Sequence, residues 1–203
     1  YQKFILSIEN QWTGLTPSAI TNAKRPDRLS HWVPQNEFIN ALVANVLLGD
    51  CFFYTCREST SFGDPKLLKT IGDFFRELLK SSYDNRWQHL EKGMGDVNID
   101  RFTLLPFLEA FFLVEDQLPG ELVSEIKDRV SGILEIQYNE YGHGRQMDPR
   151  YVGSDERFYG CYPNMDAYYC LNMYLGGWRL LGSKKYYDEY REYMSRMERA
   201  QFD

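Results

Sequence analysis

The sequence predicts an all-α fold made of consecutive antiparallel helical hairpins, and three observations indicate it. Apolar residues recur at helical spacing from Pro34 onward, whereas the alternation typical of strands is hard to find. Segments that are apolar on most sides alternate along the chain with amphipathic segments. The first kind begins near Pro34, Asp100 and Asn164, which are 66 and 64 residues apart. Such a regular step is typical of a structural repeat.

Three segments have the composition of buried helices, at residues 34–57, 101–115 and 165–181. Apolar side chains occupy most of the circumference in each of them. A helix with this pattern is expected to be covered on nearly every side. We therefore expect these three helices to lie on the inside of the fold.

The other three helices, at residues 65–80, 120–137 and 184–201, are amphipathic. In the first of them Leu67, Ile71 and Phe74 fall on one face, while Lys66, Lys69 and the other charged residues occupy the opposite face. This pattern predicts helices with one face on the core and the other in solvent.

Short and long connections alternate between these helices. The short ones, at residues 61–65, 116–120 and 181–183, contain the Ser, Asp, Pro and Gly residues that are typical of turns and helix starts. The long ones span about residues 81–99 and 138–163. We therefore expect the long connections to emerge at one end of the fold, where the buried helices begin.

Length and composition are those of a globular protein. The chain has 203 residues, of which 43% are hydrophobic and 26% charged. We treat residues 1–203 as one domain, in which residues 1–33 form an N-terminal extension near a cleft that the long connections are expected to surround. The net charge of −6 argues against a nucleic-acid partner. The most apolar stretch, residues 38–54, is interrupted by polar side chains, so we expect no membrane insertion.

The ends of the sequence suggest a piece of a longer, processed chain. The first residue is Tyr1, and the last helical stretch has no closing Gly or Pro. The four cysteines lack Cys-x-x-Cys spacing, and we interpret them as buried thiols in preference to disulfides.

A family resemblance rests on the last third of the chain. Residues 162–167 read Tyr-Pro-Asn-Met-Asp-Ala, residues 175–182 read Leu-Gly-Gly-Trp-Arg-Leu-Leu-Gly, and Lys-Tyr-Tyr follows at 185–187. This string is similar to repeats of the six-hairpin α/α-toroid enzymes that act on polysaccharides, which include heparinase-like and alginate-lyase-like lyases and several glycoside hydrolase families. The resemblance implies an incomplete α/α toroid, about half of the ring. It also implies a cleft where the inner helices begin, and a periplasmic or secreted location.

The long segments supply residues suited to binding sugars. All three histidines and three of the four tryptophans lie in residues 10–36, 83–101 and 138–166. Sugar rings stack on aromatic side chains while polar groups bind their hydroxyls. The substrate-binding candidates are His31, Trp32, Gln35, Trp87, Asp100, Arg145 and Arg157.

Two cleavage mechanisms fit the remaining candidates. A lyase that acts on a uronate glycan needs a base, an acid and a group that neutralises the carboxylate. Its catalytic candidates are His143, Tyr159, Tyr162 and Asn164. A glycoside hydrolase needs two carboxylates, for which Asp100 and Asp166, or Asp96, are the first choices. The histidine and arginines of residues 138–166 favour the lyase, because they can hold an acidic substrate.

Structural roles alone also account for some of these residues. Helix capping alone explains Asp100 and Asn164. A favourable interaction with the helix dipole alone explains Asp166. A non-catalytic helical-repeat module that binds glycan or protein is the competing function class. We expect neither a metal nor a nucleotide cofactor, since no metal-binding spacing and no phosphate-binding glycine loop is present in the sequence.

Overall fold

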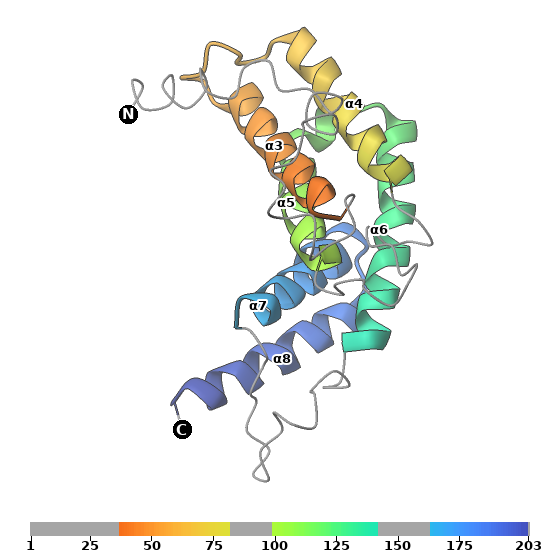
Figure 1. Cartoon of the computed structure of the whole chain (residues 1–203). Helices are drawn as coiled ribbons and strands as arrows, with labels where there is room; N and C mark the ends of the chain where they lie inside the picture. The colour runs from red at the N-terminus through yellow and green to blue at the C-terminus, as the bar shows by residue number, and fades with distance from the viewer. Residues whose placement is uncertain (1–36, 82–98, 142–162, 203) are drawn as a thin grey trace, which may run out of the picture. The chain divides into compact units, whose positions relative to one another are not determined.

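The computed structural model describes residues 37–81, 99–141 and 163–202, and these residues form helices joined by short turns, without a strand among them. The elements are α3 (Glu37–Thr55), α4 (Pro65–Ser81), α5 (Ile99–Val114), the 3₁₀ helix η2 (Glu115–Gln117), α6 (Gly120–Tyr141), α7 (Pro163–Asn172), the π-helix η4 (Met173–Leu180) and α8 (Lys184–Phe202) (Figure 1). The all-α prediction is confirmed for the described residues, and the toroid arrangement stays a prediction.

The chain divides into two compact units, residues 1–126 and 127–203, and the boundary falls within α6. Each unit is described by itself below. The predicted N-terminal extension, residues 1–33, lies outside the described residues.

In the first unit, α3 packs against both α4 and α5. The apolar face of α4 contributes Phe75, whose ring meets Phe107 of α5 edge-on at 5.1 Å between centroids and Phe111 at 6.4 Å. Edge-to-face aromatic pairs add to the stabilisation that burial of their area provides. The three helices therefore share one core.

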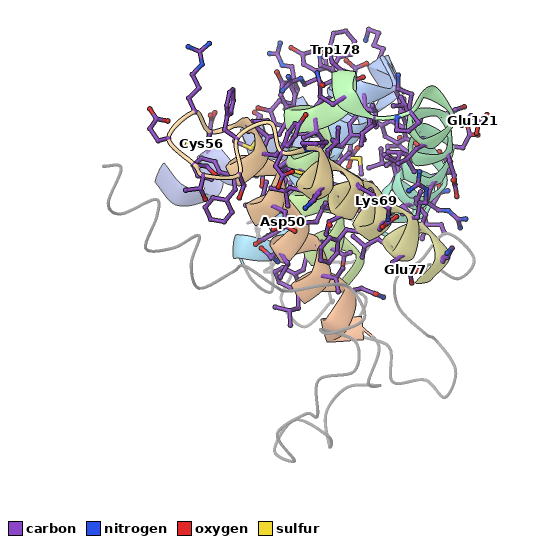
Figure 2. All side chains as sticks on the ribbon, turned by 90° about the horizontal axis from the view of Figure 1, so that it is seen from above. Asp50, Cys56, Lys69, Glu77, Glu121 and Trp178 are labelled. Carbon is purple, nitrogen blue, oxygen red and sulfur yellow. The ribbon has the colours of Figure 1, made fainter. Side chains whose placement is uncertain are left out.

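The amphipathic pattern predicted for α4 is confirmed. Its apolar face is fully buried at Ile71 and Phe74, and its opposite face carries Asp73, which pairs with Lys69 at 2.7 Å. Figure 2 shows Lys69 and Glu77 along this helix. The ion pair is exposed and adds little stability, so the buried face holds α4 in place.

The start of α4 is fixed by the predicted turn chemistry. Pro65 is the first helical residue, and the backbone N–H of Lys66 donates to Oδ1 of Asp64 at 2.8 Å. Asp64 thus caps one of the amides that a helix start leaves without a partner. Just before it, Gly63 has φ of +67°, a conformation that glycine adopts without strain.

Helices α3 and α5 run in the same direction (Figure 1). Their final residues line a common pocket, which contains Tyr54 and Thr55 from α3 together with residues 112–114 from α5. The starts of the two helices, Glu37 and Ile99, therefore lie at the other end of the pair. This orientation is the one expected for the first two inner helices of stacked hairpins.

The prediction that the apolar helices are covered on nearly every side is wrong at several positions. Leu42 of α3 is 53% exposed and Leu113 of α5 is 41% exposed. Phe52, Leu171 and Trp178 also reach solvent. Apolar composition alone does not reveal which stripe of a helix lacks a neighbour.

In the second unit, α8 packs against α7 and η4. Lys185 Nζ donates to Glu135 Oε2 of α6 at 2.6 Å, and Tyr186 Oη donates to the same oxygen at 2.9 Å. These two hydrogen bonds lower the pKa of Glu135. They join α8 to α6 within this unit.

A π-helix replaces part of the α-helix predicted at residues 165–181. The ordinary α-helix ends at Asn172, and residues 173–180 form the wider turn, in which Leu181 N donates to Gly176 O, five residues back. A Cβ added at Gly177 would overlap Cβ of Tyr186 and lie 2.6 Å from its Cγ. The missing side chain therefore lets α8 approach η4 closely, and no helical periodicity reveals this.

Replacement of Gly177 tests this packing. Gly177→Ala is expected to lower the free energy of unfolding by about 1–3 kcal/mol, because the methyl group forces α8 away from η4. Urea unfolding followed by tryptophan fluorescence measures the change. Gly120→Ala is the matched control, because a Cβ there meets no atom within 4 Å. Equal stability of the two variants would contradict the close approach.

Candidate functional site

Most of the predicted site residues lie outside the described part of the chain. These are His31, Trp32, Gln35, Trp87, Asp96, His143, Arg145, Arg157, Tyr159 and Tyr162. Asp100 belongs to the first turn of α5, and Asn164 and Asp166 belong to the first turn of α7. The helix starts that were expected to position these three residues are therefore present, and their roles stay predictions.

Buried polar side chains mark the end where α3 and α5 begin. Asn40, in the first turn of α3, is 7% exposed, and Arg101, in the first turn of α5, is 6% exposed. Thr103, two residues further along α5, is fully buried. A guanidinium carries five N–H donors, and its planar fork matches the two oxygens of a carboxylate. The buried Arg101 therefore has the chemistry of an anion-binding residue.

Arg101 and Asn40 are not among the site residues predicted from the sequence. A signal for Arg101 is nevertheless present there, because this charged residue stands at the start of an almost wholly apolar helix. Charged residues are rarely buried unless they are paired or functional.

Asp50 is a further buried carboxyl group, near the end of α3 (Figure 2). It is 8% exposed, and burial raises its pKa from 3.8 to about 7. Burial also raises the pKa of the neighbouring Cys51 thiol, and the Asp50 charge adds to this effect. Asp50 therefore keeps its proton to a much higher pH than an ordinary aspartate and can act near neutral pH as a proton donor.

The pocket at the ends of α3 and α5 has a volume of about 320 Å³. It is lined by residues from the end of α3, the turn before α4, the end of α5, and η2. They are Tyr54, Thr55, Phe62, Gly63, Phe112, Leu113, Val114, Glu115, Asp116 and Gln117. No local sequence motif joins these three separate segments, and no site was predicted at this end.

Two carboxyl groups lie one helical turn before the pocket, one on each helix. Asp50 precedes Tyr54 by four residues and Glu109 precedes Phe112 by three, so each shares a helix face with a lining residue. Partial burial raises the pKa of Glu109 as well. Acidic groups are thus present both in the pocket lining and in the helix turns that lead to it.

The cysteines are mainly structural. Cys51 and Cys170 are buried free thiols, as predicted, whereas Cys56 is half-buried and its thiol donates to Glu58 Oε2 at 3.3 Å. Figure 2 shows Cys56 in the turn after α3. Cys161 lies outside the described residues.

Within residues 37–81, 99–141 and 163–202, no group of three His, Cys, Asp or Glu side chains is placed to hold a metal ion. In the same residues, no helix is long and apolar enough to cross a membrane.

Comparison with known proteins does not place the chain in a family. Neither a protein-family model, nor a curated protein, nor a solved structure matches it. The resemblance to toroid enzymes stays a prediction.

The pKa of Asp50 predicts how stability depends on pH. The folded chain holds this proton up to about pH 7, whereas the unfolded chain releases it near pH 3.8, so this group lowers the free energy of unfolding as the pH rises between these values. Asp50→Asn removes the effect. As the pH rises from about 5 to about 8, the free energy of unfolding of the variant is expected to increase by on the order of 2 kcal/mol relative to that of the original chain.

Urea unfolding at the two pH values measures this difference. Asp73→Asn is the control. Lys69 lowers the pKa of Asp73, so the contribution of Asp73 to the free energy of unfolding depends on pH in the opposite sense to that of Asp50. A stability difference between Asp50→Asn and the original chain that does not change with pH would contradict the burial of Asp50.

Proposed function

We propose that this protein cleaves a polysaccharide or oligosaccharide, and that it acts as a lyase on a uronate-containing glycan. The supporting observation is the parallel packing of α3 and α5, with Arg101 buried at the end where both helices begin. The segments that precede Glu37 and Ile99 join the helices at this end and contain Trp32 and Trp87.

The guanidinium of Arg101 suits a uronate because it offers a planar set of N–H donors that matches a carboxylate. A carboxylate neutralised in this way makes the neighbouring C–H more acidic, which is the requirement for β-elimination. A lyase also needs a base that takes this proton and an acid that protonates the leaving oxygen, and the candidates from the sequence are His143 or Tyr159 for the base and Tyr162 for the acid. Asn164 is a second candidate for holding the carboxylate.

Substrate binding in this proposal uses the aromatic and basic side chains predicted from the sequence. Trp32 and Trp87 provide stacking surfaces for sugar rings, while His31, Gln35 and Asp100 bind hydroxyl groups. Arg145 and Arg157 attract further uronate units. Asp166 together with Asp100 would serve the alternative hydrolytic mechanism.

The products of the purified protein test the proposal. Uronate polymers and a neutral glucan are incubated with it, while near-ultraviolet absorbance and reducing ends are recorded together. A lyase produces both signals from the uronate polymer, because elimination leaves an unsaturated sugar. Reducing ends without absorbance would indicate that the protein is a hydrolase and not a lyase. Binding of the polymer without either signal would indicate a non-catalytic binding module.

Substitution of Arg101 tests its part in the site. Arg101→Gln is expected to raise KM for the uronate polymer by about 10-fold or more, since a lost hydrogen bond to a charged group costs about 1.5–3 kcal/mol. Arg101→Lys keeps the charge and should raise KM for the uronate polymer by a smaller factor. Arg76→Gln, which removes an exposed charge from α4, is the control.

Thermal unfolding of each variant separates a folding defect from a binding defect. An unchanged KM in a folded Arg101→Gln variant would show that Arg101 does not belong to the proposed site.

A further inference from the structure

We infer that the pocket at the ends of α3 and α5 binds a small organic cation that carries an alkylated ammonium group. This site lies at the opposite end of the helix pair from Arg101 and is independent of the proposed cleavage. The side chains that line the pocket and the helices that end there both favour such a ligand.

Three aromatic rings line the pocket, from Tyr54 of α3, Phe62 of the following turn, and Phe112 of α5. The face of an aromatic ring is electronegative and attracts ammonium groups, and sets of such rings are the usual receptors for alkylated ammonium ions. Phe62 is 51% exposed, which is unusual for a phenylalanine and leaves its ring accessible to a ligand.

The electrostatic environment favours a cation. Glu115 and Asp116 line the pocket, and its lining among the described residues includes no Lys, Arg or His. The C-terminal ends of α3 and α5 both meet here, and the end of a helix carries about half a negative charge. Neither helix has a basic residue in its last turn to offset this charge. This arrangement of charge favours a cation over a uronate or another anion.

The lining also favours an organic cation over a metal ion. The lining has two carboxylate side chains, and among the described residues no group of three His, Cys, Asp or Glu side chains is placed to hold a metal ion, whereas Ca²⁺ and Mg²⁺ need about six oxygens. The volume of about 320 Å³ suits a small molecule. An alkylated ammonium ion matches both parts of the lining, since its methyl groups contact the rings and its charge faces the carboxylates.

Choline and its neutral isostere, 3,3-dimethylbutan-1-ol, test the inference because they share a shape and differ in charge. Each is titrated into the isotope-labelled protein while the backbone amide signals are recorded by NMR. Choline is expected to shift signals of the lining residues, including Thr55, Gly63 and Gln117, and to bind at least about fivefold more tightly than the isostere.

Two pairs of variants locate the site. Phe62→Leu should weaken choline binding about threefold or more, whereas Phe52→Leu, which alters another exposed phenylalanine outside the pocket lining, should not. Asp116→Asn should also weaken binding and reduce its dependence on salt, whereas Asp128→Asn, an exposed aspartate of α6, should not.

Several outcomes would overturn the inference. Equal affinity for choline and the isostere would show that charge is not recognised. Shifts at these amides with a neutral disaccharide but not with choline would make the pocket a sugar site. Choline binding that survives in both Phe62→Leu and Asp116→Asn would place the ligand elsewhere. None of these measurements depends on glycan cleavage, so the cation site and the proposed function fail separately.

Discussion

Two adjacent helices that run in the same direction place their starts together at one end and their finishes together at the other. In this chain α3 and α5 are such a pair. Side-by-side parallel helices bring like ends of their dipoles together, which costs some electrostatic energy. The fold offsets this cost by burying large apolar side chains on both helices and on α4, among them Leu47, Phe75 and Phe107. The two ends of the pair then acquire different chemistry.

The starting end is polar, since two helix N-termini, the buried Arg101 and the buried Asn40 lie there. The finishing end is negative, since helix C-termini, Glu115 and Asp116 surround a pocket with aromatic walls. An anionic glycan and an organic cation are therefore expected at opposite ends of one helix pair. The separation follows from the orientation of the two helices, and it would be lost if one of them were reversed.

Much of the helical framework could be predicted from the sequence, because it depends on local patterns. Periodicity located the helical segments that the structure describes, and Asp64 and Pro65 indicated where α4 begins. Features that depend on partners distant in sequence could not be predicted. The π-helix forms where Gly177 meets Tyr186, and the exposure of Leu42 depends on which helices pack beside α3.

The candidate sites divide in the same way. The predicted sugar-binding residues were chosen by residue type within the N-terminal segment and the long connections, and most of them lie outside the described residues. Asp50 gained significance only from its burial, whereas Arg101 is also marked in the sequence as a charged residue at the start of an apolar helix. The pocket gathers residues 54–55, 62–63 and 112–117, which become neighbours only through the packing of α3 against α5.

The orientation of α3 and α5 is therefore the claim to test first. Spin labels are placed in pairs, at Arg57 with Gln117 and at Leu42 with Gln117, after replacement of the native cysteines, and double electron–electron resonance gives each distance. Parallel helices predict a short Arg57–Gln117 distance and a Leu42–Gln117 distance longer by roughly 20 Å, at about 1.5 Å per helical residue. The reverse order of distances would show antiparallel helices and contradict both proposed sites.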